Sequence, residues 1–103
     1  MKIRVLNRRT CAPKERSRGE YVGRPTILGN PYRIGVDGGR EEVIALYRVW
    51  LHRMMDMRDE AVLGELKRLR ELAKRPEGLI LLCWCKPEKC HADVIKKVLE
   101  SME

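Results

Sequence analysis

Three of the four cysteines and one of the two histidines lie within nine positions of the segment LLCWCKPEKCH, residues 81–91. Thiolates and imidazoles are ligands of zinc and of iron–sulfur clusters, and the candidate ligands are Cys83, Cys85, Cys90 and His91, with Cys11 as an alternative to His91. The same residue types suit covalent catalysis, because a thiolate is a strong nucleophile and a neighbouring imidazole can accept its proton. A third interpretation is that the cysteines are small hydrophobic core residues. The sequence leaves these alternatives open.

The catalytic interpretation gives each side chain a role. Cys90 is the expected nucleophile, since it opens the last predicted helix, where unpaired backbone amides favour a thiolate. His91 is its expected acid–base partner, and Asp93 is expected to orient the imidazole. Cys83 and Cys85 are then metal ligands or redox partners, and Cys83, deeper in its strand, is expected to be the unreactive thiol.

The segment YVGRPTILGNPYRIG, residues 21–35, holds further candidate contacts to a substrate. Arg24 is a candidate anion clamp. Gly29 is expected to adopt a positive φ, and Asn30 precedes a proline, which favours an extended backbone. Such a turn would present the Asn30 amide to a base edge or a carboxamide. The alternative is a loop that only covers the sheet edge and is held in place by Asn30.

The net charge of +7 is concentrated in one segment. Residues 1–35 hold nine basic and two acidic residues, a surplus of seven, whereas residues 36–103 hold 13 of each sign. A basic segment of this kind suits a phosphate-bearing ligand, either a nucleotide or a nucleic acid. The alternative is a solvated face of a charge-rich, thermostable protein, because 36% charged residues is typical of proteins from hot environments.

The hydrophobic pattern predicts the elements that position these residues. Expected strands cover residues 2–7, 21–23 and 79–85, and expected helices begin at residues 40, 59 and 90. The run at 79–85 is continuously apolar, which is typical of the central strand of a parallel sheet. We therefore expect an α/β fold, a small Rossmann-like three-layer sandwich with a short, mostly parallel sheet. A single domain is expected over residues 1–103, with a basic strand-and-loop segment at 1–35.

Chain direction brings the candidate groups together. The carboxyl end of the buried strand and the amino end of the last helix meet at one edge of the sheet, where ligands bind in open α/β folds. Cys83 and Cys85 are expected on one face of the strand, with Trp84 on the other. With so few strands the sheet edge is exposed, which makes a homodimer plausible.

The longest apolar run, which starts at Leu79, is far too short for a transmembrane helix. The start of the chain also lacks the apolar stretch of a signal peptide. We therefore expect a cytoplasmic protein without a membrane partner, where clustered thiols are metal ligands or reactive groups more often than disulfides.

Nearly the whole chain resembles the domain of unknown function 4326 family. The resemblance rests on NRR near the start, on YVGRPTILGNPYRIGVDGGREEVIALYRVWL and on LLCWCKPEKCHADVIKKVL. The matching positions are Asn7, Gly23, Arg24, Gly29, Asn30, Pro31, Arg40, Cys83, Trp84, Cys85, Pro87, Cys90, His91 and Asp93. The closing Cys-His motif is also similar to that of the domain of unknown function 488 family. The resemblance implies that the Cys-His motif and the G-R-P…G-N-P loop form one site, and it adds Asn7 to the expected substrate contacts.

The function expected from these features is that of a small enzyme acting on a nucleotide, a nucleoside or a nucleic-acid base. Its Cys/His site lies at the turn from strand to helix, with zinc or an iron–sulfur cluster as the possible cofactor. The alternative is a non-enzymatic nucleic-acid-binding module with a structural metal site. A third hypothesis is a dimeric accessory protein with no chemistry of its own.

Overall fold

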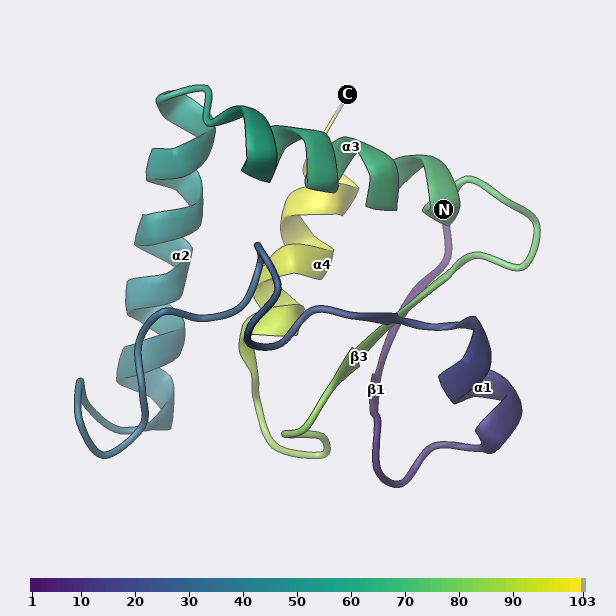
Figure 1. Cartoon of the computed structure of the whole chain (residues 1–103), viewed down its shortest axis with the longest axis horizontal. Coiled ribbons are helices and arrows are strands. Elements are labelled where there is room, and N and C mark those ends of the chain that lie inside the picture. Colours follow the sequence, from purple (N-terminus) through teal and green to yellow (C-terminus); the bar gives the residue numbers. More distant parts are fainter. Residues whose placement is uncertain (103) are drawn as a thin grey trace.

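A computed structural model describes residues 1–102, which form a three-stranded parallel sheet and four helices (Figure 1). The strand order is β1-β3-β2. The chain thus has the α/β fold that the sequence predicts. The strands are β1 Ile3–Asn7, β2 Glu20–Tyr21 and β3 Leu79–Cys83, and the helices are α1 Pro13–Arg18, α2 Arg40–Asp56, α3 Glu60–Ala73 and α4 His91–Ser101.

Strand β3 is the centre of the sheet and pairs in parallel with both neighbours. All five of its residues are buried, as its continuous apolar run predicts. On one face, Leu81 and Cys83 belong to the core formed with α3 and α4. On the other face, Gly19, which directly follows α1, packs closely against β3. A Cβ on Gly19 would lie 2.7 Å from Leu82 Cγ. Helix α1 is therefore a short third layer against β3.

Strand β3 ends at Cys83, two residues before the predicted end. A turn begins there, because the Glu88 amide donates to the Cys85 carbonyl over 2.7 Å. Helix α1 lies in a segment that was predicted to be mostly irregular. It spans six residues, none of them buried, so it has no apolar period to detect. Its start is stabilised instead by Glu15, whose carboxylate accepts from the Ala12 amide.

The three longer helices follow their predicted apolar faces. Tyr47 and Leu51 of α2 and Leu66 and Leu69 of α3 are fully buried. Asp59 caps α3 as expected, since its carboxylate accepts from the Val62 amide over 3.0 Å. Helix α4 packs on β1 and β3 and against α2 and α3. Within the described residues, none of the helices is both long enough and apolar enough to cross a lipid bilayer.

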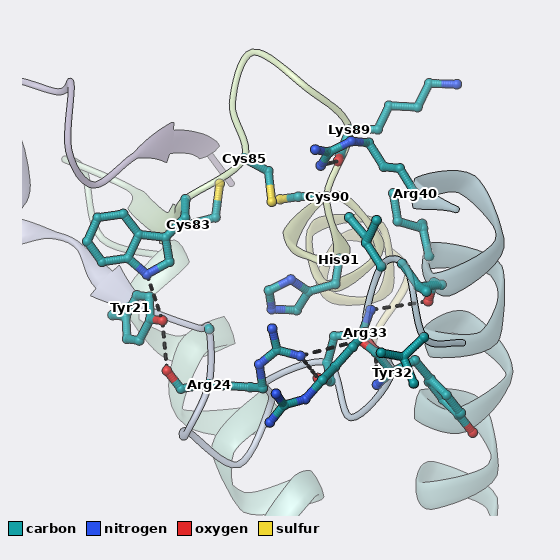
Figure 2. A pocket seen from close by; sticks show the side chains of 17 residues that line it. Tyr21, Arg24, Tyr32, Arg33, Arg40, Cys83, Cys85, Lys89, Cys90 and His91 are labelled. Carbon is teal, nitrogen blue, oxygen red and sulfur yellow. Dashed lines mark hydrogen bonds between the residues drawn. The ribbon is translucent and has the colours of Figure 1, made fainter. Parts of the chain in front are cut away.

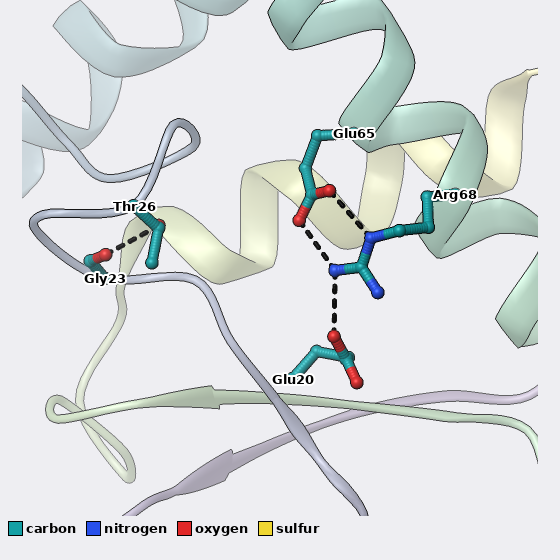
Figure 3. A network of polar contacts seen from close by, with 5 residues as sticks. All are labelled: Glu20, Gly23, Thr26, Glu65 and Arg68. Carbon is teal, nitrogen blue, oxygen red and sulfur yellow. Dashed lines mark hydrogen bonds and ion pairs between the residues drawn. The ribbon is translucent and has the colours of Figure 1, made fainter.

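The two-residue strand β2 is connected to α3 by a polar network around Arg68 (Figure 3). Its guanidinium donates to Glu20 of β2 over 2.8 Å and to both carboxylate oxygens of Glu65. Such exposed ion pairs contribute at most about 1 kcal/mol each, so the network orients β2 more than it stabilises the fold. Beyond β2, the Thr26 hydroxyl donates to the Gly23 carbonyl over 2.6 Å and closes the turn that carries Arg24.

Gly29 does not adopt the positive φ expected from the sequence; among residues 1–102 the glycines that do are Gly35, Gly38 and Gly78. Two backbone segments instead approach each other closely at Gly29. A Cβ there would lie 2.9 Å from Arg24 N and 3.1 Å from the Gly23 carbonyl carbon. The absence of a side chain at Gly29 therefore lets the loop fold back onto the turn that carries Arg24.

Replacement of Gly29 by Ala should lower the free energy of unfolding by about 1–3 kcal/mol, because the new methyl group meets backbone atoms that cannot rotate away. Gly64→Ala is the matched control. Gly64 lies in α3, and a Cβ at this position would meet no heavy atom within 4 Å, so alanine should raise stability by about 0.5–1 kcal/mol. Urea unfolding of both variants is the measurement. Equal effects of the two substitutions would contradict the close approach.

Candidate functional site

A cavity of about 650 Å³ lies beyond the ends of β2 and β3 and at the start of α4 (Figure 2). This volume is within the range of about 300–1,000 Å³ typical of small-molecule sites. The position is the carboxyl edge of a parallel sheet, as expected. Three kinds of group line the cavity: thiols and an imidazole from the Cys-His motif, cations from the loop and α2, and aromatic rings.

Cys83 and Cys90 meet at the floor of the cavity. Cys83 is the last residue of β3, and Cys90 is the N-cap of α4, where its sulfur accepts from the Ala92 amide over 3.3 Å. The chain between them makes a turn that returns it to the sheet edge, and both residues line the cavity. Both residues are buried, with exposures of 1% and 2%. Cys85 also lines the cavity and is more exposed.

The two thiols titrate as one pair, with the first negative charge on Cys83. The hydrogen bond from the Cys90 thiol lowers the pKa of Cys83 to about 6, against the opposing effect of burial. The backbone amides of Cys85 and Lys86 and the Lys86 ammonium also lower it. The bond to Cys83 and burial raise the pKa of Cys90 above its ordinary range. These shifts favour Cys83 over Cys90 as the first thiolate, whereas the sequence-based hypothesis made Cys90 the activated thiol and Cys83 the inert one.

His91 is the first residue of α4, and its ring is held by a backbone carbonyl. The Nε2 atom lies 2.7 Å from the Val22 oxygen, which can only accept, so Nε2 carries the proton. The Tyr47 ring packs edge-on against the imidazole at 5.0 Å. Burial lowers the pKa of His91, so the ring is neutral and Nδ1 remains an acceptor.

Asp93 contacts the turn and the start of α4. One carboxylate oxygen accepts from the Cys90 amide over 3.1 Å, and the other binds Lys86 Nζ at 2.7 Å. The first contact is half of a capping box, in which Cys90 is the N-cap and Asp93 the third helical residue. Asp93 therefore positions Cys90, and the group that orients the imidazole is the Val22 carbonyl.

Arg24 and Asn30 line the cavity as expected. The Arg24 side chain is exposed, and its Nη1 donates to the Asn30 carbonyl over 3.2 Å. The Asn30 carboxamide itself is engaged within the protein: Nδ2 donates to the Val43 carbonyl over 3.1 Å, and Oδ1 accepts from the Tyr32 amide over 2.9 Å. It connects the loop to α2, which is the alternative role that the sequence left open.

Asn7 and Gly29 lie outside the set of residues that line the cavity. Asn7 ends β1, where its Nδ2 donates to the Trp84 carbonyl over 3.1 Å and to the Lys86 carbonyl over 2.9 Å. It therefore holds the turn that leads from Cys83 towards Cys90. Gly29 serves the loop through its close backbone contact. Both residues therefore fix backbone segments that carry cavity-lining residues, and neither lines the cavity itself.

Three further cations line the cavity besides Arg24, and the sequence-based site did not include them: Arg33, Arg40 and Lys89. Arg40 opens α2 and its Nη1 donates to the Lys89 carbonyl over 3.0 Å. Among residues 1–102, Arg24, Arg33 and Arg40 have no carboxylate partner, and no acidic side chain lines the cavity. The signal for Arg40 was its place among the family-matching positions, whereas Arg33 lay in a loop without a motif of its own.

The residues present do not fit the expected metal cage. Within residues 1–102, the His, Cys, Asp and Glu side chains form no group of three that could hold a metal ion. Cys90 Sγ accepts from the Ala92 amide, and His91 Nε2 is hydrogen-bonded to the Val22 carbonyl. The zinc or iron–sulfur cofactor therefore remains a prediction that this arrangement does not support.

Comparisons with known proteins give one result for the family. The family model described as Domain of unknown function (DUF4326) matches residues 5–101. No curated protein and no solved structure matches the chain.

Thiolate absorbance in the ultraviolet, followed against pH, should show which cysteine ionises first. In a Cys11→Ser/Cys85→Ser background, one thiolate should form with an apparent pKa of about 6 and disappear with Cys83→Ser. Cys90→Ala should raise that pKa, because it removes the donor. The depressed pKa of Cys83 contributes stability that is complete above the ordinary thiol pKa of about 8.5 and is lost as the pH falls through about 6. The raised pKa of Cys90 acts in the opposite direction above about 8.5, so the pair should stabilise the fold most between these two pH values. A low-pH thiolate that persists without Cys83 would contradict the assignment.

Chelation should leave the melting temperature unchanged, because within residues 1–102 no group of three ligating side chains could hold a metal ion. The measurement is a thermal melt of anaerobically purified protein with and without a strong chelator, together with elemental analysis. One zinc or one cluster per chain, lost together with stability on chelation, would contradict this account and restore the metal cage.

Proposed function

The chain belongs to the family described as Domain of unknown function (DUF4326), and we propose that its cavity binds a phosphate-bearing nucleotide-like molecule on which the Cys83–Cys90 pair acts. The observation that carries the proposal is the cavity's charge: within residues 1–102, four cations and no acidic side chain line about 650 Å³ of space beside the thiol pair. The substrate class comprises nucleotides, nucleosides and nucleic-acid bases, of which the cations favour those carrying phosphate.

The cations suit a phosphate group in particular. Arg24, Arg33 and Arg40 are guanidinium groups, whose planar fork matches the oxygens of a phosphate and binds two of them at once. Lys89 adds a fourth charge, although its exposed ion pair with Glu41 at 3.1 Å weakens its contribution. A cluster of like charges in a concave site raises the local concentration of anions. The cationic side of the cavity is therefore the expected phosphate end.

The other walls suit a sugar and a base. Tyr21 and Tyr32 contribute aromatic rings, and Ile34 and Ile44 contribute apolar surface. Rings and aliphatic side chains of this kind pack against a planar heterocycle, and the few polar groups then fix its orientation. The thiol pair lies at the floor, so the ligand's reacting atom is the one that lies deepest.

The chemistry that we propose is nucleophilic. The Cys83 thiolate donates a sulfur lone pair to an electrophilic carbon of the ligand and forms an S–C bond. The electron pair displaced from that carbon stays on the ligand, where it takes the proton of the Cys90 thiol. Neutral His91 supplies a proton acceptor at Nδ1 for the hydroxyl or water that later breaks the S–C bond.

Isothermal titration with nucleoside 5′-monophosphates and the matching nucleosides tests the cavity. The monophosphates should bind at least about tenfold more tightly, since a charge-assisted bond contributes roughly 1.5–3 kcal/mol. Arg24→Gln should remove most of that difference and leave nucleoside binding unchanged. Arg53→Gln, on an exposed part of α2 away from the cavity, is the matched control. Equal affinity for nucleosides and monophosphates, or no binding of either, would contradict the proposal.

A further inference from the structure

Two aromatic rings that line the cavity have two arginines from another part of the chain beside them. Trp84 directly follows β3, lines the cavity and is 49% exposed. Tyr21 ends β2, and the two rings meet edge-on with centroids 6.2 Å apart. We call Arg8, Arg9, Tyr21 and Trp84 the aromatic–arginine patch. Two adjoining rings with two arginines beside them offer a ligand both a stacking surface and positive charge.

Hydrogen bonds fix the rings relative to the cavity. Trp84 Nε1 donates to the Tyr21 hydroxyl over 2.9 Å, and that hydroxyl donates to the Arg24 carbonyl over 2.8 Å (Figure 2). Gly23 leaves room for the hydroxyl, because a Cβ at this position would collide with it. The patch is therefore continuous with the turn that carries Arg24.

The cations of the patch are presented from an ordered turn. The Arg8 guanidinium lies 4.9 Å from the centre of the Tyr21 ring and 5.6 Å from that of Trp84, and Arg9 lies 5.4 Å from Trp84. Their backbone is held by Arg16, whose Nε donates to the Arg8 carbonyl over 2.8 Å. Among the described residues, neither Arg8 nor Arg9 pairs with a carboxylate.

A free mononucleotide leaves this patch without a partner. The proposed function places its phosphate on the cations inside the cavity, around Arg24. Arg8 and Arg9, which lie outside the cavity, would then have no phosphate to bind. The patch has the composition of a site for an unpaired base with its flanking phosphates: an aromatic face for stacking and arginines for the backbone. A duplex hides its base faces in the stack and offers an exposed indole only its backbone and groove edges.

We infer that the aromatic–arginine patch binds single-stranded nucleic acid, so that one nucleotide of the strand enters the cavity while its neighbour stacks on Trp84. This inference rests on the proposed function of the cavity and names its substrate class. Arg8 and Arg9 bind the phosphates on the outer side of the stacked base. Part of the excess positive charge of residues 1–35 is thereby assigned to phosphate binding beside the cavity.

Fluorescence anisotropy with labelled oligothymidylate, a labelled blunt duplex of the same length and competing thymidine 5′-monophosphate tests the inference. The single strand should bind at least about tenfold more tightly than either competitor, because stacking adds roughly 1–3 kcal/mol per base. Trp84→Ala should weaken strand binding by about tenfold and leave monophosphate binding within about twofold. Trp84→Phe keeps an aromatic face and should retain most of the affinity. In a Trp50→Phe background, the strand should also quench the remaining Trp84 fluorescence.

Arg8→Gln/Arg9→Gln should flatten the dependence of log affinity on log salt by up to about 1.4, since single strands release about 0.7 counterion per neutralised phosphate. Arg48→Gln/Arg53→Gln removes the same charge from exposed positions on α2 and should leave the slope unchanged.

The inference is overturned if the strand binds no more tightly than the monophosphate, if the duplex binds equally well, or if Trp84→Ala has no effect. A different result would show that the proposed function of the cavity is wrong. In that case strand binding would depend on Trp84 but not on Arg24, and the monophosphate would not bind.

Discussion

The site depends on one constraint, the central position of β3. Because β3 is paired on both edges and buried on both faces, its carboxyl end opens towards the start of α4 at a single edge of the sheet. Cys83 at the end of β3 and Cys90 at the start of α4 therefore line the same cavity. Other contacts support this placement: Asn7 holds the intervening turn, and Asp93 and the Ala92 amide hold Cys90. The thiol pair thus forms part of the cavity wall.

The electrostatic arrangement follows from the same placement. Backbone amides and Lys86 favour a negative charge on Cys83, and the bond to Cys83 keeps the proton on Cys90. Three of the four cavity cations, Arg24, Arg33 and Arg40, come from a separate part of the chain, and Lys89 comes from the turn between Cys83 and Cys90. Under the proposed function, a Cys83 thiolate beside these cations would act on a substrate that carries phosphate away from its reacting atom.

Strands and helices with a clear pattern of apolar residues could be predicted from the sequence. Contacts that are made by backbone atoms could not. The continuous apolar run identified β3, and the apolar stripes identified α2, α3 and α4. Helix α1 was missed because its six residues bury no side chain. The partner of His91 is the Val22 carbonyl, which no residue type indicates. Which thiol ionises first depends on the Cys90 thiol and on amides at Cys85 and Lys86, and these groups lower the pKa of Cys83, the thiol that the sequence-based hypothesis made inert.

A crystal structure of the protein with a bound nucleoside 5′-monophosphate tests the central claim most directly, that the cavity holds a phosphate-bearing ligand over the thiol pair. The account predicts the phosphate within hydrogen-bond distance of Arg24 and at least one other guanidinium of the cavity, with the base or sugar facing Cys83. A ligand whose phosphate lies on the surface of residues 1–20 while the cavity contains only water would contradict it.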